Sequence, residues 1–232
     1  MKAYSIVIRD HEVSEFGYSN LVQSSNDIGN DFEVNRFTAI TPNQVLDLLD
    51  NESLKWNYPW EGRQIDFQSG LVKTAYTTKN PNARIACALS HYMLWKKSLE
   101  MDETILILEH DAKFIKKIDF DPNETTFGAI GINDPRGATR LSNVFYQKVK
   151  ENDSKFQVAP YVDSDLKIPQ GLAGNSAYIL KPRMASELIN AVKHYGLWPN
   201  DALMCRQLFT GELGVTREFY TTIQKLESTT VN

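Results

Sequence analysis

The sequence predicts an α/β fold, a single domain in which a mostly parallel central sheet is flanked by helices. Two short apolar runs, residues 104–108 and 127–132, contain no alternating polar positions. Such runs are typical of strands buried on both faces, as in sheets that helices cover on both sides. Residues 3–39 add a strand–helix–strand pattern, which favours the same class because alternating strands and helices are typical of α/β domains.

The first elements follow from the alternation of apolar and polar segments. Residues 3–8 and 33–39 are predicted strands, and residues 12–28 between them are a predicted helix. Residues 41–49 are also a predicted helix, because Thr41 offers an N-cap and the proline after it suits the first helical position.

The middle of the chain departs from this pattern over residues 50–82, which carry Trp56, Tyr58 and Trp60 among glycines and prolines. Flexible linkers do not usually contain two tryptophans, so we expect an irregular excursion anchored to the core by its aromatic side chains. The following segment, residues 83–99, is apolar on most sides at its start. It is the clearest predicted helix and is expected to be central and buried.

The second half of the chain continues the α/β pattern. It is predicted to contain a loop over 133–141, a surface hairpin or lid over 150–170, a strand over 176–180 and a helix over 182–194. The sequence shows no internal repeat and no interdomain linker. We therefore expect residues 1–232 to form one domain, and 232 residues can bury a sizeable core.

Composition limits the class of protein. The chain is 42% hydrophobic and 23% charged, which is ordinary for a globular protein, and its net charge of −4 gives no global attraction to nucleic acid or anionic membrane. Two cysteines are too few for a disulfide framework and suit a reducing compartment. The start of the chain does not resemble a signal peptide and no apolar run reaches the length of a membrane span, so we expect a soluble, cytoplasmic protein.

Glu109 and Asp111 are the main candidate site residues, because they directly follow the apolar run 104–108. Ligands of such sheets bind beyond the carboxyl ends of the strands, and residues two apart on an extended segment point to the same side. Two carboxylates there could hold Mn²⁺ or Mg²⁺ and clamp a diphosphate, which is the chemistry of a nucleotide-sugar transferase. The alternative is a solvent-facing acidic strand end. His110 points to the opposite side, where it could support a ligand or be a satisfied histidine.

Ser90 and His91 form a polar pair on the otherwise apolar helix 83–99, and such a pair needs hydrogen-bond partners when it is buried. The pair could lie near the diphosphate or the acceptor, or His91 could be a core histidine. Cys87 and His91 are four residues apart, a workable spacing for zinc, but no second local cluster completes such a site. Cys205 is the only other cysteine.

Asp201 follows a proline turn after the helix 182–194, a good place to present a carboxylate into a cleft. An inverting sugar transfer needs a general base that takes the proton of the attacking hydroxyl, and a carboxylate suits this role. The alternative is that Asp201 is the N-cap of a helix over 202–209.

Positive charge gathers on both sides of the acidic motif. These residues could hold phosphates or approach a polyanionic acceptor such as nucleic acid, or they could form a solvated cationic face. They are Lys113, Lys116, Lys117, Arg136 and Arg140.

Several segments, taken in order, resemble glycosyltransferase family 25, the lipooligosaccharide-synthesis and collagen-galactosyltransferase-like group. Residues 85–111 contain Cys-Ala-Leu-Ser-His, and the segment Leu-Glu-His-Asp-Ala starts at residue 108. These two segments are similar to the family's Cys-Ala-Leu-Ser-His helix and to its Leu-Glu-Asp-Asp-Ala strand end. The remaining segments that resemble the family are Arg9-Asp10, 32–39, 174–180, 199–201 and 227–230.

The resemblance implies a GT-A fold, a nucleotide-diphosphate sugar donor that is often UDP-linked, a divalent metal and inversion at the anomeric carbon. It implies that Asp111 and Glu109 bind the metal, with Asp111 the more direct ligand. It implies that Asp201 and His91 are catalytic, with Asp201 as the base and His91 close to the donor. The residues that it places at the donor are Arg9, Asp10, Ser90, Glu109 and His110. His110 replaces the middle acid of the family motif, which lowers the negative charge at the site.

The acceptor is expected to be a glycan hydroxyl. A hydroxymethylated base in phage-type DNA is the alternative, supported by the local lysines and arginines and opposed by the net charge. Two rival classes are a metal-dependent phosphohydrolase or nuclease, which would need further acids around the metal, and a catalytically silent glycan-binding module.

Overall fold

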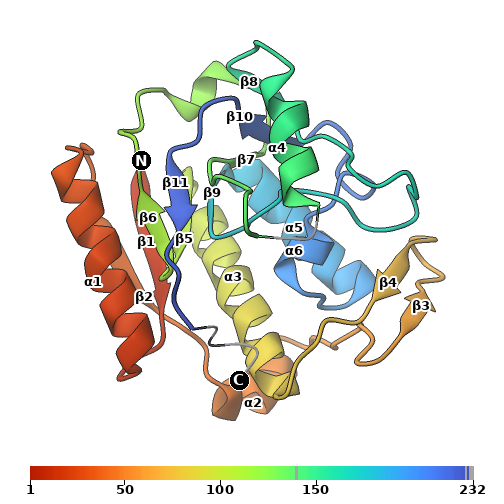
Figure 1. The fold of residues 1–232 in the computed structure, drawn as a ribbon. Helices are drawn as coiled ribbons and strands as arrows, with labels where there is room; N and C mark the ends of the chain where they lie inside the picture. The colour runs from red at the N-terminus through yellow and green to blue at the C-terminus, as the bar shows by residue number, and fades with distance from the viewer. Residues whose placement is uncertain (139–140, 228, 230–232) are drawn as a thin grey trace.

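The computed structural model describes residues 1–138, 141–227 and 229. These residues form a seven-stranded sheet in the order β2-β1-β5-β9-β7-β10-β8, with helices on both faces (Figure 1). The strands are β1 (Lys2–Val7), β2 (Val34–Thr38), β5 (Ile105–Glu109), β7 (Ala129–Gly131), β8 (Phe156–Val158), β9 (Ala177–Leu180) and β10 (Leu213–Thr216). Strands β1, β2, β5, β7 and β10 run in one direction, and β9 and β8 run against them. The predicted mostly parallel α/β sheet is confirmed.

Helices and short strands complete the described part of the chain. The helices are α1 (Glu12–Asp27), α2 (Val45–Asn51), α3 (Pro81–Met101), α4 (Ser142–Lys150), α5 (Pro182–Tyr195) and α6 (Asn200–Leu203), with 3₁₀ turns η1 (Pro42–Gln44) and η2 (Pro122–Glu124). Two antiparallel pairs lie outside the main sheet: β3 (Arg63–Ile65) with β4 (Val72–Thr74), and β6 (Ala112–Phe114) with β11 (Thr221–Ile223). Among the described residues, no helix has both the length and the apolar character needed to cross a membrane.

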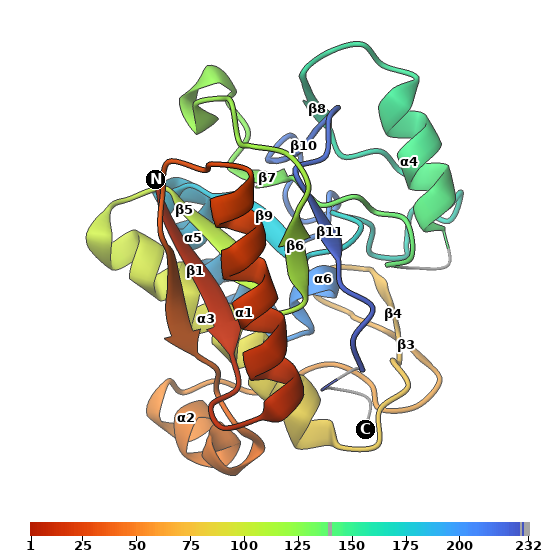
Figure 2. The same cartoon turned by 60° about the vertical axis from the view of Figure 1, so that its left-hand side comes forward.

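The sheet separates two hydrophobic clusters, and β5 contributes to both. Ile105 and Ile107 belong to the cluster that contains residues of α3 and α5, whereas Leu106 and Leu108 belong to the cluster on the α1 side. Because successive side chains of a strand point to opposite faces, both faces can be apolar only if the run is unbroken. Figure 2 shows α1 in front of the sheet and α3 behind it.

The central helix α3 begins with Asn80, whose side chain accepts a hydrogen bond from the backbone of Ala83, and Pro81 occupies its first position. Leu89, Leu94 and Trp95 are fully buried. The helix ends at Met101, and the C-cap residue Asp102 adopts a left-handed conformation with φ of 51°. This confirms the predicted buried helix and extends it by two residues at each end.

Several local predictions need correction. The helix predicted over 41–49 is divided into η1 and α2, and the strand predicted over 127–132 is only β7. Residues 150–170 do not form a hairpin of their own, because β8 pairs with β10. Helix α4 precedes this segment and was not predicted from the sequence. Short amphipathic elements such as α4 and β8 leave a weak periodic signal.

The excursion over 50–82 contains the β3–β4 hairpin, and its aromatic side chains stack in pairs. The rings of Trp56 and Trp60 are 5.1 Å apart, and those of Tyr58 and Tyr76 are 5.7 Å apart. Tyr58 also packs against Trp198, which follows α5. The aromatic residues therefore anchor the excursion to the core, as expected.

Candidate active site

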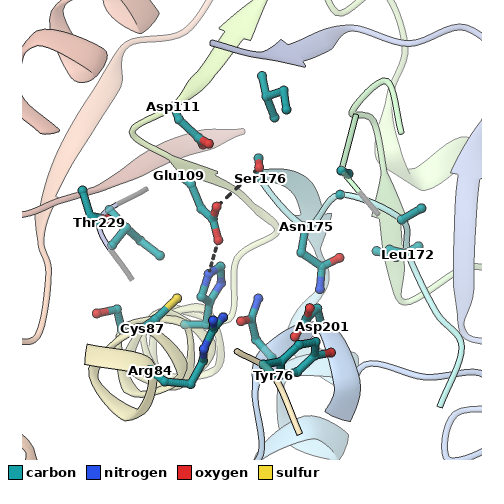
Figure 3. Close-up of a pocket in the computed structure, with 18 of the residues that line it drawn as sticks. Tyr76, Arg84, Cys87, Glu109, Asp111, Leu172, Asn175, Ser176, Asp201 and Thr229 are labelled. Atoms are coloured by element: carbon teal, nitrogen blue, oxygen red, sulfur yellow. Dashed lines mark hydrogen bonds and ion pairs between the residues drawn. The ribbon is translucent and has the colours of Figure 1, made fainter. Parts of the chain in front are cut away.

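A cavity of about 1000 Å³ lies at the edge of the sheet where β1 and β5 end. Because β9 runs antiparallel to β5, the residues just before β9 meet the residues at the end of β5 at this edge. The start of α3, the segment before β9, helix α6 and the C-terminal segment provide the other walls (Figure 3). A volume of this size is typical of small-molecule and cofactor sites.

Glu109 is the last residue of β5 and points into the cavity. Its side chain is 30% exposed. One carboxylate oxygen lies 3.2 Å from Nε2 of His91, and the other accepts a hydrogen bond of 3.3 Å from the hydroxyl of Ser176. Burial alone would raise the pKa of Glu109, but His91, His110 and Ser176 together outweigh it and hold the pKa below its usual value.

His91 is completely buried and links Glu109 to the core. Trp95 donates from Nε1 to the hydroxyl oxygen of Tyr178 at 2.8 Å, and that hydroxyl lies 3.0 Å from Nδ1 of His91. The donors and acceptors match when Tyr178 donates to Nδ1 and His91 donates from Nε2 to Glu109. In this arrangement His91 orients the carboxylate of Glu109, which makes it a positioning residue.

Asp111 lies in the turn between β5 and β6 and lines the same cavity. Its Oδ1 is buried and has no hydrogen-bond partner among the described residues. Burial and the charge of Glu109 raise the pKa of Asp111 to about 7. A buried, unpartnered carboxylate oxygen beside a second carboxylate is a costly arrangement that a divalent cation would satisfy, so the residues fit such an ion.

The turn that carries Asp111 is held by Gln224 of the C-terminal segment. The backbone N–H of Gln224 donates to the carbonyl of Asp111 at 2.6 Å. Its side-chain amide donates to the carbonyls of Ala112 and of Gly17 in α1, both at 2.9 Å. The acidic turn is therefore tied both to α1 and to the end of the chain.

Asp201 faces the acidic turn across the cavity, with Tyr76 and Arg84 beside it (Figure 3). Helix α6 starts at Asn200, so Asp201 lies inside its first turn and is not the N-cap of a helix over 202–209. Burial is the main cause that raises the pKa of Asp201, the charge of Glu109 adds to it, and Arg84 opposes it. A carboxylate with a raised pKa is suited to act as a general base.

Two further polar groups in the cavity wall are open toward a ligand. Oδ1 of Asn175 and Nε of Arg84 are buried and have no hydrogen-bond partner among the described residues. Asn175 is only 6% exposed. Buried polar atoms without partners are rare in folded proteins, and a bound molecule would satisfy them.

Ser90, Arg9 and Asp10, which were also predicted to bind the donor, make contacts with other parts of the protein or with each other. The hydroxyl of Ser90 donates to the carbonyl of Ala86 at 2.8 Å and accepts from the backbone N–H of Ile40 at 2.9 Å, so it braces the cavity wall. Arg9 and Asp10 are exposed, form an ion pair of 3.6 Å with each other, and are not among the cavity-lining residues.

His110 packs against α1. A side-chain carbon on Gly17 would lie only 2.7 Å from the His110 carbonyl oxygen and 3.2 Å from its ring. Burial lowers the pKa of His110. The close packing explains why α1 has a glycine at residue 17.

The cations around the acidic motif are largely paired. Lys116 lies 3.7 Å from Asp119, Lys117 lies 2.8 Å from Asp31, and Arg136 lies 2.6 Å from the carboxylate two residues before it. Arg140 lies outside the described residues. Pairing reduces the positive field that these side chains present to a polyanion.

Four residues of the site were missed by sequence reasoning: Tyr76, Arg84, Asn175 and Ser176. Asn175 precedes the predicted strand 176–180 and Ser176 begins it, but only the antiparallel pairing of β9 with β5 places them beside Glu109. Tyr76 and Arg84 precede or begin α3, and no local pattern distinguishes them from residues that anchor the excursion.

Solved structures that are similar to this chain include two glycosyltransferases, both of low similarity. The apo form of the glycosyltransferase GlyE of Streptococcus pneumoniae TIGR4 is 7% identical, with a TM-score of 0.42 over 93% of this chain, and the chain spans 45% of that protein. Apo mouse xyloside xylosyltransferase 1 is 10% identical, with a TM-score of 0.38 over 91% of this chain and 83% of that one. Neither likeness indicates what this chain binds.

Comparison with curated protein sequences gives no significant match. The family model described as glycosyltransferase family 25 (LPS biosynthesis protein) matches residues 9–204. The match begins just after β1 and contains the acidic turn, the segment before β9 and Asp201, all of which line the cavity described above. The chain therefore belongs to glycosyltransferase family 25.

Proposed function

We propose that this glycosyltransferase moves a sugar from a nucleotide-diphosphate donor, UDP-linked, to a hydroxyl of a glycan acceptor, with inversion at the anomeric carbon. The proposal places the reaction in a single GT-A domain over residues 1–232 and assigns Mn²⁺ or Mg²⁺ to Glu109 and Asp111. One observation carries it: two carboxylates at the end of β5 face a third, Asp201, across one cavity, and Asp111 has an oxygen without a protein partner.

The three carboxylates divide the chemistry between them. A divalent ion at Glu109 and Asp111, when bound, supplies positive charge that stabilises the leaving nucleoside diphosphate. Asp201 accepts the proton of the acceptor hydroxyl while the acceptor oxygen bonds to the anomeric carbon and the bond from that carbon to the diphosphate oxygen breaks. Arg84, with Nε free of partners among the described residues, can bind an oxygen of the diphosphate.

The walls around Asp201 favour a glycan as acceptor. Tyr76 offers an aromatic ring and Asn175 a buried carbonyl oxygen, which are groups that can stack on and hydrogen-bond to a sugar. The DNA alternative relied on the cations near the acidic motif, and Lys116, Lys117 and Arg136 are engaged in ion pairs. We therefore assign the acceptor to the glycan class.

The donor site is tested by thermal unfolding with nucleoside diphosphates, with and without Mn²⁺. A ligand at 100 times its Kd stabilises the native state by about 2.7 kcal/mol, and each kcal/mol raises the Tm of a domain of this size by about 2–4 °C. We expect a shift of roughly 5–10 °C that requires Mn²⁺. Asp111→Asn should abolish the shift, because the amide removes the negative charge that attracts the ion.

Asp50→Asn is the matched control, because Asp50 is exposed at the end of α2 and does not line the cavity. This variant should keep the full shift. A shift of wild-type size in Asp111→Asn would contradict the assigned metal site, and no shift with any nucleotide in the wild type would contradict the donor class.

A further inference from the structure

Cys87 lies in the cavity wall on the first turns of α3, next to the residues that hold Glu109 (Figure 3). Cys87, His91 and Glu109 each offer one ligand atom, and these three atoms all lie within 4.8 Å of one another. Cys87 and His91 share a face of α3 because they are four residues apart. The end of β5 supplies the third ligand, which no local cluster in the sequence provides.

The chemistry of these three ligands differs from that of the Glu109 and Asp111 pair. Thiolate and imidazole select zinc-class ions, whereas carboxylates and water suit Mg²⁺ and Mn²⁺. Ligand atoms around a tetrahedral zinc ion, with bonds of about 2.0–2.3 Å, stand roughly 3.3–3.6 Å apart. His91 Nε2 and Glu109 Oε1 are already 3.2 Å apart, and the Cys87 sulfur lies within 4.8 Å of the ligand atom of each of the other two residues.

His91 is supported through its other nitrogen, as metal-binding histidines commonly are. Nδ1 lies 3.0 Å from the hydroxyl of Tyr178, and Trp95 donates to the same hydroxyl at 2.8 Å. When the ion binds, the ring proton of His91 shifts from Nε2 to Nδ1, where the Tyr178 hydroxyl oxygen accepts it, and Nε2 presents its lone pair to the ion. Cys87 and Glu109 both line the cavity, so an ion can enter and take water as a fourth ligand.

We propose that Cys87, His91 and Glu109 form a binding site for a zinc-class divalent ion. Binding replaces the hydrogen bond between His91 and Glu109 by two bonds to the ion, and the thiol proton leaves to solvent. The site shares Glu109 with the proposed donor site, so an ion bound there would compete with the ion at Glu109 and Asp111. Formation of the site itself does not depend on the proposed function.

Cobalt(II) tests this site directly on the full chain, because a cobalt–thiolate bond gives a charge-transfer absorption band in the near ultraviolet. We expect the wild type to show this band on titration with Co²⁺ and to lose it on addition of Zn²⁺. Cys87→Ser should lose the band. Cys205→Ser is the matched control, because Cys205 is buried and is not among the cavity-lining residues, and it should keep the band.

A second variant separates ligation by His91 from a loss of folding. Tyr178→Phe keeps the ring that packs on His91 but removes the hydroxyl that supports Nδ1. We expect it to lower the affinity for Co²⁺ by about 10–100-fold while the circular dichroism spectrum stays that of the wild type. Unchanged affinity would contradict the proposed support of a metal-bound His91 by the Tyr178 hydroxyl.

Absence of the band in the wild type at saturating Co²⁺, or its persistence in Cys87→Ser, would overturn the proposal. The titration contains neither donor nor acceptor. A chain that shows the band but transfers no sugar would therefore refute the proposed function and leave the metal site standing.

Discussion

At Asp201, burial and two neighbouring charges of opposite sign act on the pKa of one carboxylate. Burial raises its pKa first, the charge of Glu109 raises it further, and the charge of Arg84 lowers it. Arg84 is held in place beside the ring of Tyr76, with the guanidinium carbon 5.2 Å from the ring centre. The ionised fraction of the proposed base therefore depends on Arg84.

This dependence predicts the direction of a pH effect. Asp201 accepts a proton only when ionised, so turnover falls as the pH falls through its raised pKa. Arg84→Gln removes a charge that lowers this pKa, and the acidic limb of the kcat profile should move to higher pH. Measuring kcat against pH at saturating donor and acceptor tests this. Arg183 is exposed and lies outside the cavity lining, so Arg183→Gln should leave the acidic limb of the kcat profile in place. If the acidic limb did not move in Arg84→Gln, Arg84 would not control the pKa of the base.

At the scale of elements, the β3–β4 hairpin shows how a polar contact can anchor an irregular segment. Lys73 of β4 is 1% exposed and donates to Asp66 at 2.9 Å and to the carbonyl of Asn57 at 2.7 Å. Its Nζ also lies 4.8 Å from the ring centre of Trp198. These contacts connect the hairpin to the segment after α5.

Removing one partner of this buried pair should destabilise the protein strongly. Lys73→Met leaves the charge of Asp66 buried and uncompensated, and we expect the free energy of unfolding to fall by about 3–5 kcal/mol. Lys79→Met at an exposed position should change it by less than about 0.5 kcal/mol. Urea unfolding of both variants measures the difference. If the free energy of unfolding fell no further in Lys73→Met than in Lys79→Met, the ion pair would not be what holds the hairpin.

The elements also show which parts of the fold can be predicted from sequence. Strand β5 and helix α3 were predictable, because an unbroken apolar run and a long, mostly apolar helix each leave a strong local signal. The direction of β9 was not, because a strand buried on both faces looks alike in either direction. Strand β3 was not predictable either, since all three of its residues are exposed and show no alternation.

At the scale of the whole molecule, the candidate site depends on bringing distant segments to one sheet edge. The acids at the end of β5 were predictable, because ligand sites of α/β sheets lie at the carboxyl ends of strands. The positioning role of His91 was not, because it needs Tyr178 from β9 and Trp95 in contact at once. The tertiary structure also brings Ser176 next to Glu109 and Tyr76 next to Asp201. These residues are too far apart in the sequence for a local motif to reveal the contacts.

Asp201 as the general base is tested most directly by comparing sugar transfer and donor binding in Asp201→Asn. We expect this variant to bind the nucleotide-sugar with wild-type affinity, because the acids at the end of β5 remain, while turnover falls by about 10²–10⁴-fold through loss of the general base. Both quantities can be measured on the same preparation, with Asp50→Asn as the control. Turnover close to that of the wild type in Asp201→Asn would contradict the assignment of Asp201, and with it the proposed mechanism.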